Sequence, residues 1–558
     1  MKTKIRSLFF LIIAFVLVVS SCVSDDGKSE KVTYEPTWES LVTAPVPEWM
    51  MDAKFGIYTH WGVYSVPAFA APIYSQLMYS SLENDDRGVR KYHEEKYGSI
   101  FDFGYKDFVP MFTAPEFDPV EWVDVMKSGG VKFAGICMVH HDGFCLWDSE
   151  YTRWDSKDMG PKRDIYGELA KEIRKQDLHL LATFHHARTY GHINDHARNS
   201  GFTDEEKSKL DIYDPQYNDF YRNPETVTKE EFNTEWQNKV SEVIKKYQPD
   251  AFWFDGLSNQ IKDGTIDEEQ LLKTFADYYN EGTPYVDQPI IMNKLPSGKV
   301  WNFPLGFGMR CYENGRDMEL DVRGDWLMDR AISAPWTYVN NKTYSRKSSN
   351  HIVYLIDVTA RGGVVLLSLT PKGDGSIPDE EKEIMKGIGD WLAVNGEGIY
   401  STRTWKVVEE GLGAADLRTN IFNERKGKWG YKWNLKDLEE SAGEAFRFTR
   451  SKDYKTLYTF VYGKPENGEV MIKTLKKGNV AKSGAGIKSV SMLGTDAKIE
   501  WEQTEEGLKI VFPENLPCDV AYGFKILPKG GKIDDAPKEK WDDPIERKGD
   551  WPVFKSVR

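Results

Sequence analysis

Short apolar runs alternate with helical patterns from Lys54 to about Trp391, and this alternation limits the possible folds more than any other feature. It predicts a parallel sheet, and for one large domain it favours a (β/α)8 TIM-like barrel. A doubly wound sheet is the alternative, although no glycine-rich phosphate loop follows the first strand. The candidate strands are residues 54–59, 132–139, 178–184, 251–254, 289–292, 308–312, 331–338 and 364–369.

Polar residues follow many of these strands. In a barrel, functional side chains gather at the carboxyl ends of the strands. One such histidine is most simply a structural residue, but so many polar strand ends together indicate a site. They are His60-Trp61, His140-His141-Asp142, His185-His186, Asp255, Asn293 and Glu313.

The stretch Ala251-Phe252-Trp253-Phe254-Asp255-Gly256 is the strongest of these signals. Its aromatic run is typical of a buried strand. A carboxylate at the end of such a strand is costly unless it is paired, hydrogen-bonded or functional. Gly256 allows a sharp exit from the strand. A helix N-cap or a satisfied aspartate at the edge of the core is the structural alternative.

Two carboxylates at strand ends, close to histidines and tryptophans, suggest glycoside hydrolysis. Asp255 suits the nucleophile, because a barrel strand would hold it rigidly. Glu313, just past a strand, is the candidate acid/base, and Glu319 is a second candidate. Trp253 points to the same side of its strand as Asp255 and could pack on a sugar face.

The net charge of −14 argues against binding to nucleic acids or anionic membranes as the main function. Residues 1–22 resemble a lipoprotein signal peptide, with basic residues, a short apolar run and a lipobox that ends at Cys22. The alternative is an ordinary secretory signal. We expect a protein lipid-anchored at a bacterial outer membrane through Cys22, facing the surface or the periplasm.

The chain divides into four predicted parts. A polar tether at 23–36 follows the signal peptide, and a catalytic barrel occupies 37–400. Residues 401–558 predict an antiparallel β-sandwich with a charged tail, because alternating stretches at 445–449, 456–462, 469–474 and 508–512 are separated by turn residues.

Several motifs, in matching order over roughly residues 48–402, resemble the α-L-fucosidases of glycoside hydrolase family 29. The C-terminal region around 446–473 also resembles that family's C-terminal domain. The motifs are MDAKFGIYTHWG at 51–62 with YSVPA at 64–68, HHDGFCLWDS at 140–149, YQPD at 247–250 with WFDG at 253–256, LIDV at 355–358 with GG at 362–363, GDGSIP at 373–378 and WLAVNGEGIY at 391–400.

The resemblance implies an exo-acting retaining α-L-fucosidase with Asp255 as nucleophile and a fucosylated oligosaccharide or fucan-type polysaccharide as substrate. It implies no cofactor and no metal. Glu313 is placed as acid/base by its distance from Trp326 and Trp336. The implied substrate-binding residues are His60, Trp61, His140, His141, His185, Trp253, Arg310 and Trp336.

One departure from the family pattern concerns the sugar site. Pro72-Ile73 stands where the family usually has Glu-Trp before Tyr-Ser. Loss of a buried hydrogen-bond partner costs about 1–3 kcal/mol for a hydroxyl that needs it. Without the carboxylate, a sulfated or otherwise substituted fucose would meet less repulsion, and Arg188, Arg198 or Arg310 could pair with the anion.

Two other interpretations stay open at this point. A surface lipoprotein that binds glycans on a decayed barrel, without catalysis, would also explain the loss of Glu-Trp. A metal site at His140-His141-Asp142 is the other, but adjacent histidines on one strand point to opposite faces and make poor joint ligands.

Overall fold

The computed structural model describes residues 32–294, 303–304, 306–313, 325–411, 418–423, 428–433 and 442–534, with the backbone alone for 418–423 and 428–433. Residues from Tyr34 onward belong to one compact unit. The signal peptide, Cys22, Glu319 and the end of the charged tail lie outside the described residues. Within the described part of the chain, no helix has the length and apolar character needed to cross a bilayer.

Eight parallel strands close into a barrel in chain order, from β1 beside β2 round to β8 beside β1. This confirms the predicted (β/α)8 architecture. The strands are β1 (Phe55–Thr59), β2 (Phe133–Val139), β3 (His179–Phe184), β4 (Ala251–Phe254), β5 (Ile290–Lys294), β6 (Met309–Cys311), β7 (Trp326–Ala331) and β8 (Val364–Leu369).

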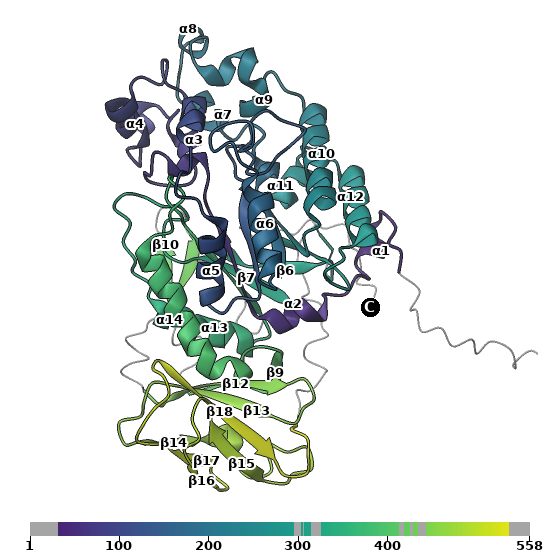
Figure 1. Ribbon diagram of the computed structural model, residues 1–558, viewed down its shortest axis with the longest axis vertical. Helices are drawn as coiled ribbons and strands as arrows, with labels where there is room; N and C mark the ends of the chain where they lie inside the picture. The colour runs from purple at the N-terminus through teal and green to yellow at the C-terminus, as the bar shows by residue number, and fades with distance from the viewer. Residues whose placement is uncertain are drawn as a thin grey trace, which may run out of the picture. The chain divides into compact units, whose positions relative to one another are not determined.

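Helices surround these strands (Figure 1). The longer ones are α4 (Val89–Tyr97), α5 (Pro119–Ser128), α6 (Ile165–Lys175), α10 (Lys229–Tyr247), α12 (Glu268–Glu281), α13 (Ser348–Ala360) and α14 (Asp379–Asn395). The shorter ones are α1 (Trp38–Leu41), α2 (Glu48–Ala53), α3 (Tyr74–Leu77), α7 (Asn194–Arg198), α8 (Asp204–Lys207), α9 (Asn218–Tyr221) and α11 (Leu257–Lys262).

Strand β4 shows how the sequence sets the two layers of the core. Phe252 and Phe254 point outward: Phe252 meets Tyr278 of α12, and Phe254 meets Trp236 of α10. Trp253 points inward and joins the apolar cluster that fills the barrel. Because side chains alternate along a strand, Asp255 follows on the inward side, at the carboxyl end of the barrel.

The seventh strand differs from the prediction, which placed it at 331–338. It is β7, Trp326–Ala331. Asp329 and Arg330 are buried in it, and charged residues in an apolar run hide a strand from sequence reading. Beyond Ala331 the chain bends, and the Ala334–Pro335 peptide bond is cis.

The C-terminal region holds antiparallel sheets around an apolar core of its own, which confirms the predicted sandwich. Of the stretch predicted at 469–474, only the first four residues are a strand; Lys473–Leu475 is a 3-10 turn. The five-stranded sheet has the order β15 (Ile487–Met492), β18 (Ala521–Pro528), β13 (Leu457–Tyr462), β12 (Ala445–Ser451) and β9 (Thr402–Gly411). The other sheets are β14 (Glu469–Ile472), β17 (Leu508–Val511) and β16 (Glu500–Gln503), and the pair β10 (Arg418–Asn423) and β11 (Lys428–Trp433).

A buried ion-pair network joins the barrel to the C-terminal sheet. Arg447 of β12 donates to Asp357 of α13 at 2.7 Å, and Arg361 also pairs with Asp357 at 3.2 Å. Glu409 of β9 accepts from Arg361 at 2.6 Å. The side chains of Arg447 and Asp357 are 0% and 1% exposed, so removing either charge would leave the other buried with less compensation.

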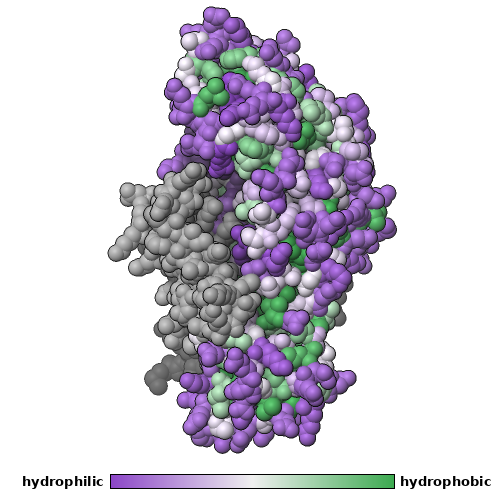
Figure 2. All heavy atoms as spheres, turned by 90° about the vertical axis from the view of Figure 1, so that its left-hand side faces the viewer, coloured by the Kyte–Doolittle hydropathy of each residue, from purple (hydrophilic) through white to green (hydrophobic). Residues whose placement is uncertain are grey.

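The surface viewed in Figure 2 is mostly hydrophilic, and its hydrophobic residues occur in small separate groups. That pattern is ordinary for a globular protein, whose apolar side chains are scattered over the surface as well as buried.

Candidate active site

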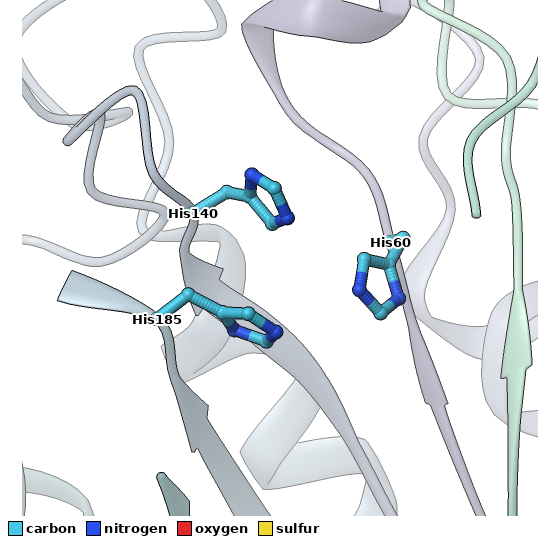
Figure 3. Close-up of side chains that lie close together, drawn as sticks. All are labelled: His60, His140 and His185. Atoms are coloured by element: carbon cyan, nitrogen blue, oxygen red, sulfur yellow. The ribbon is translucent and has the colours of Figure 1, made fainter. Parts of the chain in front are cut away.

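Four histidines meet at the carboxyl ends of the first three strands. His60 follows β1, His140 and His141 follow β2, and His185 follows β3. The His60 ring lies 5.5 Å from His140 and 5.3 Å from His185, centroid to centroid, and His140 lies 4.9 Å from His185. Figure 3 shows the rings of His60, His140 and His185 turned toward one another from separate strands.

Hydrogen bonds fix the orientation of three of these rings. Nδ1 of His60 lies 2.7 Å from Oγ of Ser368 on β8, and Nδ1 of His185 lies 3.1 Å from Sγ of Cys137 on β2. Nδ1 of His141 lies 3.2 Å from the backbone oxygen of His185. A ring held at Nδ1 presents its Nε2 edge to the centre of the site.

Burial lowers the pKa of all four histidines well below the ordinary value, because a charged imidazolium is poorly solvated there. The rings are therefore neutral near pH 7, and each has one N–H donor and one acceptor. Among the described residues, Nδ1 of His140 is buried without a hydrogen-bond partner. Neutral histidines of this kind are suited to a ligand rich in hydroxyl groups.

Asp255 lies next to these rings, with its side chain 4% exposed. Its carboxylate is 3.2 Å from Nζ of Lys294, 3.4 Å from Nε2 of His141 and 3.5 Å from Nη1 of Arg188. Burial alone would raise the pKa of Asp255, but the charges of Lys294 and Arg188 overcome that effect and hold the pKa well below its usual range. Asp255 is thus a buried, ionised carboxylate.

Lys294, the last residue of β5, lies between two carboxylates. Its Nζ is 3.2 Å from Oδ1 of Asp255 and 3.2 Å from Oε2 of Glu313, just after β6. Burial opposes the charge of Lys294, but Asp255 and Glu313 raise the pKa of the lysine above its ordinary value. The two candidate catalytic residues are therefore neighbours, as two strand-end carboxylates in one barrel predict.

A third carboxyl group lies among the residues that line the barrel. Asp329 of β7 is 1% exposed and accepts from Sγ of Cys311 at 3.2 Å and from the hydroxyl of Tyr58 at 3.4 Å. Burial raises the pKa of Asp329 to about 6, although Lys294 opposes the rise. This group can change its protonation close to neutral pH.

The aromatic residues predicted for the site separate into two groups. Trp253 lies 5.0 Å from the His185 ring, and Trp336 lies 4.9 Å from the His60 ring. Trp61 is 1% exposed and packs against Phe112, Phe117 and Trp122. Its indole donates to the backbone oxygen of Lys372, so Trp61 packs in the aromatic core that follows β1, and its predicted contact with substrate stays a prediction.

Two other polar strand-end residues serve the scaffold. Asp142 accepts from the hydroxyl of Tyr105 at 2.6 Å, and Nδ1 of His186 lies 2.8 Å from Oγ1 of Thr189. Arg310 is a half-buried residue of β6, the strand that precedes Glu313.

His140 and His141 do not point to opposite faces, which corrects the expectation from strand alternation. Both follow the last residue of β2, so strand alternation does not apply, and their ring centroids are only 4.3 Å apart. Asp142 is engaged by Tyr105, so these three residues do not form the metal site considered from the sequence. The ring nitrogens that do gather belong to His60, His140 and His185.

Sequence reasoning missed three residues of the site. The sequence does not indicate Lys294, because the predicted fifth strand ends at Met292 with Asn293 as its polar end, whereas β5 continues to Lys294. Asp329 was hidden in the strand that was not recognised. His192, whose ring lies 4.9 Å from His141, comes from the loop after β3, and no sequence pattern indicates it.

Comparisons with known proteins agree with this geometry. The family model described as "Alpha-L-fucosidase" matches residues 21–397, and the model "Alpha-L-fucosidase C-terminal domain" matches residues 439–527. The tissue alpha-L-fucosidase of Rattus norvegicus is 28% identical over 502 residues, covering 88% of this chain and 92% of its own. An alpha-L-fucosidase of Dictyostelium discoideum is 26% identical over 526 residues, covering 92% and 98%.

Solved structures give the same result. The alpha-fucosidase of Thermotoga maritima in complex with fucose superposes with a TM-score of 0.63 at 28% identity. The match covers 88% of this chain and all of that one.

Proposed function

The chain belongs to the α-L-fucosidase family of glycoside hydrolases, and from that premise we propose that it is an exo-acting, retaining enzyme. It removes terminal α-L-fucosyl residues from glycans through a covalent glycosyl-enzyme intermediate. Asp255 is the nucleophile and Glu313 the acid/base.

The spacing of the two carboxylates carries this proposal. Their nearest oxygens each lie 3.2 Å from the same Lys294 nitrogen, so these oxygens are at most twice that distance, 6.4 Å, apart. Retaining glycosidases have carboxyl groups about 5–5.5 Å apart, whereas inverting ones leave about 6.5–9.5 Å for a water molecule. This limit applies to one pair of oxygens and is compatible with the retaining spacing of the two carboxyl groups.

The reaction proceeds in two steps. An oxygen of Asp255 attacks the anomeric carbon while the bond to the leaving oxygen breaks, and Glu313 gives its proton to that oxygen. In the second step Glu313 takes a proton from water, the water oxygen attacks the anomeric carbon, and Asp255 is released as a carboxylate.

Lys294 couples these steps electrostatically. Before attack, Lys294 pairs with the ionised Asp255, while Glu313 beside it carries the proton that it gives to the leaving oxygen. When Asp255 becomes an ester it loses its negative charge, and the full charge of Lys294 then stabilises the ionised form of Glu313. Ionised Glu313 is the base that the second step needs.

The histidines bind the sugar hydroxyls. His60, His140, His141 and His185 present neutral rings around one space and can each donate or accept a hydrogen bond. Trp253 is buried beside them, with its ring 5.0 Å from the His185 ring and 5.9 Å from Nζ of Lys294, and it forms part of the aromatic wall of the sugar site.

Replacement of Asp255 by glycine tests the nucleophile. We expect hydrolysis of an aryl α-L-fucoside to fall by several orders of magnitude while circular dichroism stays unchanged. Near-normal turnover in the folded variant would show that Asp255 is not the nucleophile.

Replacement of Glu313 by alanine tests the acid. Glu313→Ala should slow poor leaving groups far more than activated aryl groups, because only poor leaving groups need protonation. If Glu319→Ala shows that dependence instead, Glu319 is the acid.

We also propose that the enzyme accepts fucan-type or sulfated substrates. Arg188 lies 3.5 Å from Asp255 with its side chain 43% exposed, so its guanidinium can pair with an anion at the edge of the site. Pro72-Ile73 supplies no carboxylate to repel that anion.

Native fucan oligosaccharides should be cleaved faster than desulfated ones, and Arg188→Met should abolish this preference. Equal rates on native and desulfated oligosaccharides would contradict the proposed preference for sulfated substrates.

Export and lipid attachment at Cys22 are part of the same proposal. The lipobox before Cys22 supports them. Cys22→Ala should move the enzyme from the membrane fraction to the soluble fraction of cells that express it. An unchanged distribution would argue for an ordinary secretory signal.

A further inference from the structure

The ring nitrogens of His60, His140 and His185 form a cluster that resembles a metal-ligand set. One ring nitrogen from each lies within 4.8 Å of the other two. We propose that these three histidines form a site for a divalent transition-metal ion such as Zn²⁺, and that an ion bound there competes with the sugar.

The cluster, with nitrogens up to 4.8 Å apart, is wider than the ligand set of a bound ion. Zinc binds imidazole nitrogen at about 2.1 Å in tetrahedral geometry, so three ligand nitrogens lie about 3.4 Å apart. Each ring comes from a different strand end, and Figure 3 shows a nitrogen of each ring facing the common space. Small rotations of the side chains would close the set around an ion and leave a fourth position open.

The second nitrogens of two rings are held as in known metal sites, where a second hydrogen bond orients each histidine ligand. Ser368 holds Nδ1 of His60 at 2.7 Å, and Cys137 holds Nδ1 of His185 at 3.1 Å. In both rings Nε2 is left for the ion. His140 has its Nδ1 buried without a partner, so its ring can turn without breaking a hydrogen bond in the described part of the chain.

The surroundings decide which ions fit. Three imidazoles suit Zn²⁺, Ni²⁺ and Cu²⁺, whereas Mg²⁺ and Ca²⁺ prefer oxygen ligands. The carboxylate of Asp255 is near enough to favour a cation, but Lys294 and Arg188 oppose it. We therefore expect reversible binding by added metal ions.

Competition with the sugar rests on the proposed function, but metal binding by itself does not. An ion on the three Nε2 atoms would occupy the groups that we assign to the sugar hydroxyls. Zn²⁺ should thus raise the apparent KM for an aryl α-L-fucoside without lowering kcat.

The direct test is calorimetric titration of the full-length, metal-free enzyme, without a histidine tag, with ZnSO4. We expect one saturable site, no binding of Mg²⁺, and at least a tenfold loss of Zn²⁺ affinity in His60→Gln and His185→Gln. His141→Gln is the matched control: His141 lies beside the cluster but is not part of it, and Zn²⁺ affinity should be kept. Unchanged Zn²⁺ affinity in both cluster variants would overturn the site.

A second measurement needs no variant, so it does not depend on the variants folding. The electron paramagnetic resonance spectrum of the Cu²⁺-loaded enzyme should show coupling to three imidazole nitrogens, and fewer than three would refute the ligand set. Excess fucose should then weaken Zn²⁺ binding. If it does not, while the cluster variants still lose Zn²⁺, the metal site stands and the assignment of these histidines to the sugar is wrong.

Discussion

Replacing Lys294 by methionine should shift the pH dependence of the enzyme, because this lysine contributes more than any other charge to keeping Asp255 ionised. Methionine keeps most of the length and apolar character of the side chain but removes the charge. Two unit charges 3.2 Å apart attract each other by about 5 kcal/mol at an effective dielectric constant of about 20. Breaking a buried pair of this kind costs about 3–5 kcal/mol.

The sign of the shift follows from the role of Asp255. As nucleophile it reacts as the carboxylate, and its lowered pKa keeps it ionised far into the acid range. Without Lys294 the pKa of Asp255 rises, since burial is then opposed mainly by Arg188. The acidic limb of kcat/KM, which reports the free enzyme, should therefore move to higher pH.

The assay is a pH profile of kcat/KM with an aryl α-L-fucoside for Lys294→Met beside Lys262→Met. Lys262 is an exposed residue of α11, so its replacement should leave the profile unchanged. An acidic limb at the same pH in folded Lys294→Met as in the parent enzyme would refute the electrostatic reasoning.

Two further predictions concern stability. Gly256→Ala should lower the melting temperature more than Gly264→Ala. Both glycines have φ near +75°, a conformation that costs other residues about 1–2 kcal/mol. Only at Gly256 would the added Cβ also lie 2.3 Å from Cγ of Arg188. Equal losses, measured by calorimetry, would show that Arg188 moves away freely. Asp357→Asn should destabilise the fold by up to about 3 kcal/mol, because buried Arg447 would lose its shorter ion pair and keep the longer one with Glu409 at 3.4 Å, and a denaturation midpoint equal to that of the parent would contradict this.

Much of the fold was predictable because the barrel strands are buried on both sides. Buried strands appear as continuous apolar runs, and seven of the eight predicted ranges overlap the strands of the barrel extensively. The histidines and Asp255 were predictable for a related reason: a polar residue that ends such a run has to lie at the rim.

Strand β7, the position of Lys294 and the packing of Trp61 could not be predicted for one shared reason: each depends on interactions between residues distant in sequence. Asp329 and Arg330 interrupt the apolar pattern of β7, and their burial depends on partners from other strands, such as Tyr58 of β1 for Asp329. In the sequence Lys294 looks like any lysine near the end of a strand, because only the folded barrel brings Asp255 and Glu313 next to it. Trp61 follows His60 directly, yet it turns into the aromatic core, and its neighbours there are fixed only by the folded chain.

The ion pair between Asp357 and Arg447 has a consequence for how this protein can change over evolution. The shortest ion pair of each partner is with a residue in the other half of the molecule. If the C-terminal region were lost or exchanged for another module, Asp357 would lose this pair and keep its longer one with Arg361, and the Trp391 indole that now donates to the Ala521 backbone oxygen would lose its acceptor. We therefore expect the barrel and the C-terminal region to be inherited together. Recombination that separates the two regions should be selected against, whereas recombination outside them should be tolerated.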